Sequence, residues 1–233
     1  MKRSEYIENI LKIYSLVKVL SRKNRCEVLH LRNKQSEKSL VLRSLPQPLT
    51  VYETLQHIRC VNLPEVYDVL EMDDGQIVLE EYIDGLTLAQ AMEFEKFRKK
   101  GARKVLLGLC DALTILHDRN IIHRDVKPEN VMIDKSGRVV LIDLNVSRMH
   151  SDASKDTVVM GTVGYVSPEQ LGLSQTDART DIYATGVLYN VMLTGQHPTV
   201  TIAPGKPGRI VRKCTAVNPN ERYQTATELW QAL

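Results

Sequence analysis

The strongest constraint on the fold is a run of charged residues between two apolar segments. Residues 123–130, His-Arg-Asp-Val-Lys-Pro-Glu-Asn, are preceded by two isoleucines and followed by the apolar residues 131–133. Residues 131–143 are then predicted to form two short apolar strands about a Lys-Ser-Gly turn. This hairpin holds the charged octapeptide on one side and Asp143 on the other.

Composition limits the class of protein. With 233 residues, of which 43% are hydrophobic and 25% charged, the chain matches a soluble globular protein of one large domain or two small lobes. The net charge of +3 is too small to indicate nucleic-acid binding, and no run of Lys and Arg alternates with aromatic residues as base stacking requires. We therefore expect no nucleic-acid partner.

The cysteines and the apolar segments indicate a cytoplasmic location. The four cysteines lie far apart, without a Cys-x-x-Cys pair or a histidine at zinc-ligand spacing, which favours reduced thiols over a metal site or a disulfide framework. Glu5, Glu8 and Asn9 interrupt the N-terminal segment before a signal-peptide core is reached. No stretch approaches the ~20 apolar residues that span a bilayer, so we expect no membrane segment in this chain.

The first part of the chain is predicted to be a β-sheet with one helix. Alternating apolar residues indicate five strands, at residues 16–20, 28–31, 39–43, 65–71 and 76–82. The last two are predicted to form a hairpin, because the Asp-Gly between them supplies the positive φ of a tight turn. Residues 50–53, Thr-Val-Tyr-Glu, read as a capping box that begins a short helix.

The second part is predicted to be mostly helical. Apolar residues at spacings of three and four indicate helices at residues 87–99, 102–117 and 181–193, and a last helix that ends at Leu233. Residues 144–168 are polar and rich in hydroxyl groups. They predict a long loop, and loops of this length are uncommon unless they are functional. A link rich in Gly and Pro follows at residues 195–208.

Three segments, in order along the chain, resemble the protein kinase domain of bacterial Ser/Thr kinases. Residues 123–130 match the catalytic loop at every diagnostic position, and residues 161–169, Gly-Thr-Val-Gly-Tyr-Val-Ser-Pro-Glu, resemble the end of the activation segment. Residues 181–186, which begin with Asp181, resemble the buried helix that follows. Arg222 lies where the family pairs an arginine with the equivalent of Glu169.

The resemblance spans residues 14–233 and implies an architecture. It implies an α+β, bilobal, protein-kinase-like fold. The N-lobe, residues 1–83, would hold the sheet and a short helix. The C-lobe, residues 84–233, would be mostly helical and would carry the catalytic loop and the activation segment. Arg124, Glu169, Asp181 and Arg222 would have structural roles.

The resemblance also assigns roles to the charged residues. Asp125 would accept or orient the substrate hydroxyl, Lys127 would stabilise the migrating phosphoryl charge, and Asn130 and Asp143 would hold Mg²⁺. Lys127 together with Thr162 resembles the Ser/Thr-directed pattern. The implied activity is phosphoryl transfer from ATP to Ser or Thr hydroxyls of a protein substrate, with ATP and Mg²⁺ as cofactors.

Hydroxyl groups near Arg124 suggest a phosphorylation site. Ser151, Ser154 and Thr157 lie in the predicted loop, and a phosphorylated hydroxyl is a dianion that an arginine can bind through two hydrogen bonds. For each of the three, an unmodified polar loop residue is the alternative.

The phosphate-binding part of the N-lobe departs from the family. Ser21, Lys23 and Cys26 stand in place of the three glycines that let backbone amides approach the ATP phosphates. The basic residues of this segment either offer side-chain charge to phosphates or form a solvated turn. Arg43 replaces the strand lysine that binds the phosphates, and its planar guanidinium is not equivalent to a compact ammonium.

The carboxylate that normally pairs with this cation is missing from its expected helix position. Val51 occupies that position, and Glu53 is explained as part of the helix cap. Glu80 falls at a position that is normally apolar, where a buried carboxylate is costly unless it is paired. We therefore expect an ion pair between Arg43 and Glu80, with a one-residue slip in the alignment as the alternative.

Of three further segments, one resembles the family, one keeps only part of the family's motif and one is shorter than in the family. Residues 79–85 resemble the hinge between lobes, where Glu81 fits the usual acidic residue and Ile83 would offer backbone hydrogen bonds to adenine. Asp143-Leu144-Asn145 stands in place of Asp-Phe-Gly and keeps the metal-binding carboxylate. The link between Thr194 and Arg212 is shorter than in the family and leaves little room for its usual substrate-docking helix.

Two functions of different classes fit these residues. The first is a Ser/Thr protein kinase, slowed by its atypical N-lobe. The second is a pseudokinase that serves as a signalling scaffold or a nucleotide-sensing module. We favour the first, because four transfer-site residues with separate tasks have no common structural reason to persist in a scaffold. A kinase fold that acts on small molecules is a third, weaker alternative.

Overall fold

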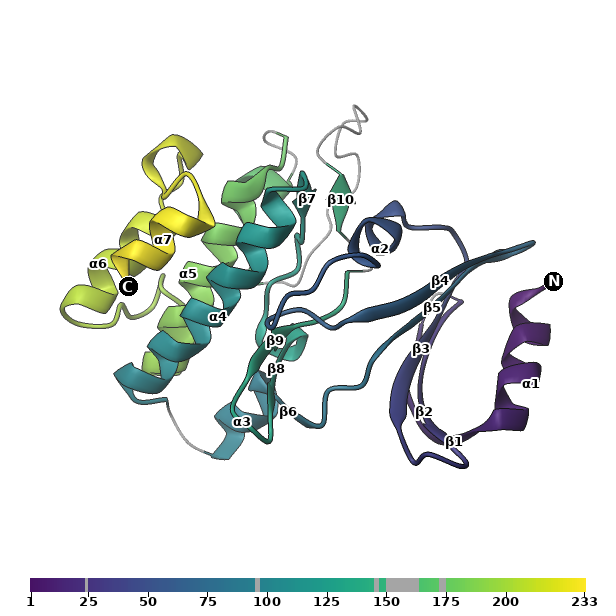
Figure 1. Cartoon of the computed structure of the whole chain (residues 1–233). Coiled ribbons are helices and arrows are strands. Elements are labelled where there is room, and N and C mark those ends of the chain that lie inside the picture. The colour runs from purple at the N-terminus through teal and green to yellow at the C-terminus, as the bar shows by residue number, and fades with distance from the viewer. Residues whose placement is uncertain (24, 95–96, 145–146, 150–163, 172–174) are drawn as a thin grey trace. The chain divides into compact units, whose positions relative to one another are not determined.

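The computed structural model describes residues 1–23, 25–94, 97–144, 147–149, 164–171 and 175–233 (Figure 1). The chain divides into two compact units. The first unit comprises Met1–Cys60 and Pro64–Ile83, and the second comprises Val61–Leu63 and Asp84–Leu233. Residues 61–63, which lie inside the predicted N-lobe range, therefore group with the second unit. None of the described helices is long and apolar enough to cross a membrane.

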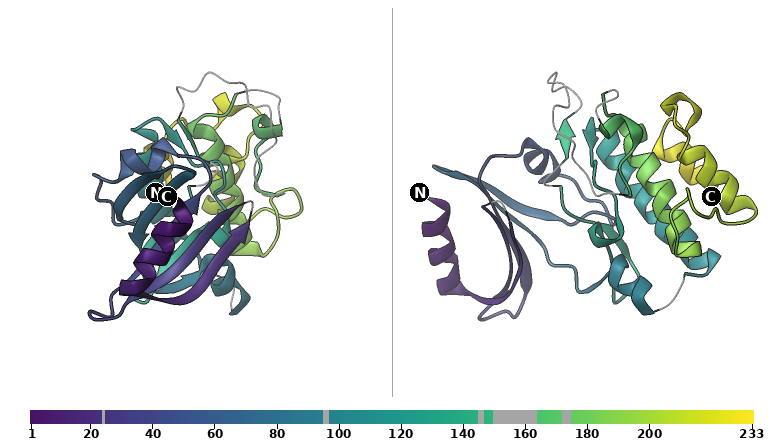
Figure 2. Two further views of the ribbon diagram at one scale, coloured as in Figure 1. Left: turned by 90° about the vertical axis from the view of Figure 1, so that its right-hand side faces the viewer. Right: turned by 180° about the vertical axis from the view of Figure 1, so that it is seen from behind.

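The first unit contains a five-stranded antiparallel sheet with the strand order β1-β2-β3-β5-β4 (Figures 1 and 2). Its strands are β1 Tyr14–Lys23, β2 Cys26–Asn33, β3 Ser39–Leu45, β4 Val66–Met72 and β5 Gly75–Glu81. All five predicted strands are thus confirmed. The turn between β4 and β5 requires Gly75, because its φ is 141° and a Cβ there would lie 2.1 Å from the Leu45 carbonyl oxygen.

A helix that the sequence analysis did not predict, α1 Arg3–Ile13, packs against this sheet. Its apolar residues Tyr6, Ile7, Ile10 and Leu11 recur at helical spacing and join the core cluster around Leu31. Figure 2 shows the helix lying alongside the strands. Glu8 and Asn9 lie between these positions, as in an amphipathic helix.

The helix α2 Thr50–Leu55 is present, but the predicted capping box is wrong. The N-cap residue is Leu49, and no side chain caps the helix. Glu53 instead accepts a hydrogen bond from Gln76 Nε2 at 3.4 Å. The Gln76 amide oxygen accepts from the Leu49 amide at 3.1 Å. The fully buried Gln76 on β5 therefore satisfies both the start of α2 and its carboxylate, which a local sequence pattern cannot reveal.

The predicted ion pair between Arg43 and Glu80 is confirmed. Arg43 Nε donates to Glu80 Oε1 at 2.6 Å, and each side chain is only 6% exposed. In the register of β3 and β5, Glu80 faces Val41 and Arg43 faces Val78. The two residues are therefore diagonal neighbours on one face of the sheet, which is within reach of long side chains. The pair excludes the alternative of a one-residue slip.

The second unit is mostly helical. Its helices are α3 Leu88–Phe94, α4 Lys99–His117, α5 Ala178–Thr194, α6 Lys206–Cys214 and α7 Ala226–Ala232. Short 3-10 helices lie at Pro128–Asn130, Pro168–Leu171 and Pro219–Glu221. The predicted helix over residues 87–99 is too long, because Phe97 and Arg98 form no helix and the next helix starts at Lys99. Residues 195–205 form no helix, but α6 was not predicted and begins at Lys206, inside the predicted link of residues 195–208.

Two small sheets complete the second unit. The strands β6 Gly85–Thr87, β8 Val131–Asp134 and β9 Val139–Leu141 pair in the order β6-β8-β9. The strand β7 Ile121–Ile122 pairs with β10 Arg148–Met149, inside the region predicted to be a loop. The predicted hairpin over residues 131–143 is confirmed in β8 and β9. These sheets place the charged octapeptide between β7 and β8.

The helices of the second unit pack closely around α5. Helix α4 lies beside α5, as Figure 1 shows. The α4 residues Leu109, Leu113 and Leu116 are fully buried. Helix α6 approaches α5 at Gly186, where a Cβ would lie 2.2 Å from the Cβ of Cys214. This approach is possible only because residue 186 is a glycine.

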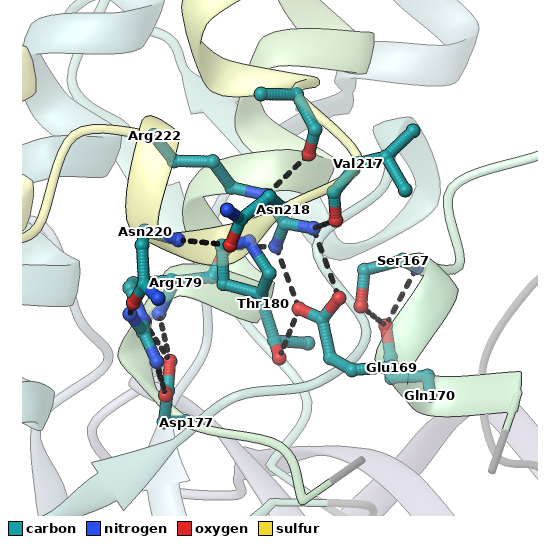
Figure 3. A network of polar contacts seen from close by, with 12 residues as sticks. Ser167, Glu169, Gln170, Asp177, Arg179, Thr180, Val217, Asn218, Asn220 and Arg222 are labelled. Carbon is teal, nitrogen blue, oxygen red and sulfur yellow. Dashed lines mark hydrogen bonds and ion pairs between the residues drawn. The ribbon is translucent and has the colours of Figure 1, made fainter. Parts of the chain in front are cut away.

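The predicted pairing of Arg222 with Glu169 is present at the centre of a polar network (Figure 3). Arg222 Nη1 and Nη2 donate to the two Glu169 carboxylate oxygens at 2.6 and 2.9 Å. Thr180 Oγ1 donates to the same carboxylate at 3.0 Å, and Arg222 also donates to the Ala216 carbonyl oxygen at 2.8 Å. The network thus joins the 3-10 helix at residue 169, the start of α5 and the chain before α7.

Loss of this ion pair is expected to destabilise the protein. The variant Glu169→Gln leaves the Arg222 charge buried, which costs about 3–5 kcal/mol. Burial raises the pKa of Glu169, but hydrogen bonds from Arg222 outweigh this effect and hold the pKa below its usual value. The stabilisation is therefore complete above the unfolded-state pKa of about 4.3 and is lost as the pH falls through the folded-state pKa.

Urea unfolding between pH 3 and pH 7 measures this effect. In Glu169→Gln, the free energy of unfolding should fall less between pH 7 and pH 3 than it does in the unsubstituted protein, because the carboxylate that takes up a proton is missing. The exposed Glu221 supplies the control, since Glu221→Gln changes the same charge in the same region. Equal losses in both variants would show that the pair contributes no specific stability.

The Arg43–Glu80 pair predicts an asymmetric result in a double-mutant cycle. Glu80→Leu leaves the cation buried and is expected to cost about 3–5 kcal/mol, whereas the double variant Arg43→Met/Glu80→Leu should cost much less. The free energies of unfolding of the single and double variants test this. Additive losses would mean that the two side chains are not coupled.

Candidate active site

A buried aspartate fixes the backbone of the charged octapeptide. Helix α5 begins at Ala178, where the side chain of the N-cap residue Asp177 accepts from the Arg179 amide, and its first turn presents Asp181. Asp181 Oδ2 accepts from the His123 amide at 2.9 Å, and Asp181 Oδ1 accepts from the Arg124 amide at 2.8 Å. The structural role predicted for Asp181 is thus visible as two hydrogen bonds to successive amides.

The last turn of α4 supplies a third partner for this carboxylate. His117 Nε2 lies 2.8 Å from Asp181 Oδ2, and Asp181 is completely buried. Burial alone raises the pKa of Asp181, but His117 and the His123 amide lower it below its usual value. The site therefore contains an ionised, fully hydrogen-bonded carboxylate. The sequence analysis missed His117, because a histidine at a helix end carries no signal of its long-range partner.

Two residues of the site adopt left-handed backbone conformations. The φ of Arg124 and of Asp143 is 67° in both cases, which is uncommon for residues other than glycine. The Arg124 amide is held by Asp181, and the Arg124 carbonyl oxygen accepts from Gln170 Nε2 at 2.9 Å. The buried Gln170, also missed in the sequence, therefore links the residues after the activation segment to the catalytic loop.

Three of the four predicted transfer residues meet at one carboxylate oxygen. Lys127 Nζ lies 2.7 Å from Asp125 Oδ2, and Asn130 Nδ2 donates to the same oxygen at 2.9 Å. Asn130 Nδ2 also donates to the Asp125 carbonyl oxygen at 2.9 Å. The Lys127 side chain is 19% exposed and the Asp125 side chain 13% exposed, so both retain access to a substrate.

The β8–β9 hairpin brings Asp143 to the same place. The Ile142 amide donates to the Asn130 carbonyl oxygen at 2.8 Å, so Asp143 follows directly after a residue that is bonded to Asn130. His123 reinforces this link, because its Nε2 lies 3.1 Å from the Ile142 carbonyl oxygen. His123 Nδ1 accepts from the Asp125 amide at 3.3 Å, so the tautomer that fits both contacts has its hydrogen on Nε2.

The oxygen donors present fit Mg²⁺. Asn130 uses its Nδ2 on Asp125, which directs its amide oxygen to other partners, and Asp143 contributes a carboxylate. Mg²⁺ usually takes one or two protein oxygens, with the remaining ligands from phosphates and water. Among the residues that the structure describes, no group of three or more His, Cys, Asp or Glu could hold a metal ion. The two protein donors, Asn130 and Asp143, are as many as Mg²⁺ usually takes from a protein.

The predicted nucleotide-binding residues lie in the first unit. Arg43 is paired with Glu80, and Ile83 is only 4% exposed. The Glu81 amide donates to the Glu65 carbonyl oxygen at 2.8 Å, and Glu81 Oε2 accepts from the Glu65 amide at 3.3 Å. Glu81, at the end of β5, is thus hydrogen-bonded to the residue just before β4. Contact of these residues with a nucleotide stays a prediction.

The basic turn between β1 and β2 is partly explained by a local ion pair. Arg22 hydrogen-bonds Glu27, which faces it in the register of the two strands, and the Arg22 side chain is 72% exposed. For Arg22, this contact favours a solvated turn over a phosphate contact. The hydroxyl residues Thr162, Ser151, Ser154 and Thr157, and also Asn145, lie outside the described residues.

Comparison with known proteins, like the geometry of the site, indicates a protein kinase domain. Residues 15–229 match the family described as Protein kinase domain. Serine/threonine-protein kinase PknB of Mycolicibacterium smegmatis is 31% identical over 209 residues, which cover 75% of this chain and 33% of the relative. The probable serine/threonine-protein kinase PknB of Corynebacterium glutamicum is 34% identical over 200 residues, which cover 70% of this chain and 31% of the relative.

This chain spans about a third of the length of the curated relatives that it matches. The match covers the catalytic loop, the hairpin that carries Asp143 and the network around Glu169. The chain therefore belongs to the protein kinase family, as a kinase domain of the bacterial serine/threonine type.

Proposed function

We propose that this domain transfers the γ-phosphoryl group of ATP to serine or threonine hydroxyls of a protein substrate. The observation that carries the proposal is the convergence of Lys127 and Asn130 on a single oxygen of Asp125. This convergence holds a carboxylate, a cation and an amide in fixed positions beside Asp143. Phosphoryl transfer depends mainly on such positioning and on charge stabilisation.

Each residue has a separate task in this reaction. Asp125 accepts a hydrogen bond from the substrate hydroxyl and takes up its proton as the oxygen attacks the γ-phosphorus. The bond between the γ-phosphorus and the bridging oxygen breaks in the same step, and ADP leaves. Lys127, held 2.7 Å from that carboxylate, places positive charge where the transferred phosphoryl group passes. Asn130 and Asp143 hold Mg²⁺, which when bound neutralises phosphate charge.

The first unit supports a slow reaction. The turn between β1 and β2 has no glycine, so its backbone amides cannot approach phosphates as closely as in the family. Arg43 shares its charge with Glu80 inside the sheet, which reduces the positive potential that it offers to a nucleotide. The nucleotide is then bound weakly or held imperfectly, and the rate of transfer falls.

The same ion pair favours a second candidate function. A pseudokinase does not need a phosphate-binding cation, and Glu80 neutralises the cation present. In that case the domain would act as a signalling scaffold or a nucleotide-sensing module. The two functions differ in whether phosphate is transferred, and in both cases the partner is a protein.

The location is also a proposal. We propose that the domain works in the cytoplasm, where ATP is available. The thiols of Cys110 and Cys214 are buried and free, as expected in a reducing compartment.

Substitution of Asp125 tests the transfer function. Asp125→Asn keeps the size of the side chain but removes the base, so phosphate incorporation into a Ser/Thr peptide library should fall by a factor of about 10² to 10⁴. Radiolabelled ATP supplies the measurement. Asp118→Asn, at an exposed aspartate just after α4, is the matched control and should leave the rate unchanged. A signal that persists in Asp125→Asn would identify a contaminating kinase.

Thermal unfolding with ATP separates the two candidates. At a hundredfold excess of ATP over its dissociation constant, stability should rise by about 2.7 kcal/mol. Because Asp143 is assigned to the cation, Asp143→Asn should remove the Mg²⁺-dependent part of this shift and keep the rest. A shift without any phosphate transfer would establish the nucleotide-sensing alternative. The absence of any shift would contradict the kinase function and leave only the scaffold.

A further inference from the structure

A groove in the second unit lies between α4 on one side and α3 and β6 on the other. It has a volume of about 900 Å³. Its lining residues are Leu86, Ala91, Phe94, Phe97, Arg98, Lys100, Gly101, Arg103, Lys104 and Leu107. None of these residues belongs to the candidate active site. The groove is therefore a separate feature of the domain.

One face of α4 forms a wall of the groove. Arg103 and Lys104 lie three and four residues after Lys100, and Leu107 lies three residues after Lys104, so the four share one side of the helix. Phe97 packs near the helix start, because a Cβ on Gly101 would lie 3.4 Å from its Cδ1 atom. The wall thus combines three cations with an apolar floor.

The opposite wall is apolar and open to solvent. Phe94 on α3 is 78% exposed and Leu86 on β6 is 46% exposed, although both are large hydrophobic residues. Single exposed hydrophobic residues are ordinary, but here they line a groove together with Ala91, Phe97 and Leu107. A ligand with an apolar side chain would remove this surface from water.

The described lining of the groove is basic. Arg98, Lys100, Arg103 and Lys104 are among its lining residues, and none of those that the structure describes is Asp or Glu. Arg103 also donates through Nε to the Leu233 carbonyl oxygen at 2.9 Å, which fixes its side chain while it keeps its charge. Opposite charge on a partner would be attracted at long range and matched at contact.

The groove continues along α4. A second hollow, of about 380 Å³, shares Lys104 and Leu107 with the first and extends to Asp111 and the β8–β9 turn. The Lys104 ammonium marks the junction, because a Cβ on Gly137 in that turn would lie 3.0 Å from Lys104 Nζ. At 1.5 Å per residue, α4 rises about 16 Å from Lys100 to Asp111, the length of about five residues of extended peptide.

We propose that this groove docks a short acidic segment of a protein substrate. An aliphatic or aromatic side chain of the segment packs against Phe94 and Phe97, and its carboxylates face Lys100 and Lys104. The length, the apolar floor and the four basic side chains of the first groove together fit such a linear segment. The proposal names the partner class of the proposed kinase. Docking apart from the site of transfer would raise the local concentration of the acceptor hydroxyl.

Direct binding tests the proposal without any phosphate transfer. The probe is the fluorescein-labelled peptide Glu-Asp-Leu-Glu-Phe-Asp-Glu, titrated with the whole chain and followed by fluorescence anisotropy in the absence of ATP. The charge reversal Lys100→Glu/Lys104→Glu should weaken binding by at least about tenfold, and Phe94→Ser should weaken it as well. Lys99→Glu is the matched control, since this neighbour is exposed and lies outside the groove.

Several outcomes would overturn the proposal. These are no binding of the peptide, an equal loss in Lys99→Glu, or equal binding of a peptide with lysine in place of each acidic residue. Capture of anionic phospholipid vesicles that the peptide does not displace would identify a membrane surface instead. Concentration-dependent self-association that Phe94→Ser abolishes, without peptide binding, would identify a second copy of the chain as the occupant.

Enzyme kinetics test whether the docked segment belongs to a substrate. If the domain is active, a substrate peptide that carries the acidic segment should show a higher KM in Lys100→Glu/Lys104→Glu with kcat unchanged. An equal KM would contradict docking of a substrate. Because anisotropy is measured without ATP, an inactive domain still yields the binding result. A failure of the proposed kinase function is thus distinguished from a failure of the docking proposal.

Discussion

The geometry of the site depends on one buried carboxylate. Asp181 receives the amides of His123 and Arg124 and lies 2.8 Å from His117, so it joins α4, α5 and the catalytic loop at one point. A charge in a fully buried position is tolerated only when every such partner is in place. Any arrangement of the loop that released these amides would leave an unsatisfied ion in the core. The position of Asp125 follows from this constraint, because it is the next residue of the same loop.

The first unit also contains a buried charge, and its partner lies in the same sheet. Arg43 and Glu80 are neighbours on β3 and β5, so the cation is paired by a strand instead of by a helix. The sequence resemblance places Val51 where the family has its carboxylate, and the nearby Glu53 contacts Gln76. A pair built into adjacent strands keeps its geometry for as long as the sheet is folded.

The sequence predicts most of the fold, and the exceptions have physical causes. The five strands, the hairpin before Asp143 and the Arg43–Glu80 pair follow from periodicity and from the cost of burying a lone charge. Helix α1 was missed because its apolar stripe gains stability only by packing on a sheet from later residues. The capping box failed because Gln76, distant in sequence, competes for Glu53. Partners such as His117 and Gln170 are set by tertiary contacts alone.

The backbone of the site is strained at two residues, Arg124 and Asp143. Arg124 and Asp143 both have a φ of 67°, and such conformations cost about 1–3 kcal/mol each in residues other than glycine. Asp181 and Gln170 hold Arg124 in place, and Asn130 and His123 hold the residue before Asp143. A scaffold could relax these positions, for example with glycine, and gain stability. These contacts offset the strain and fix the direction of the backbone on either side of Asp125 and at Asp143, as the proposed transfer role of the two carboxylates requires.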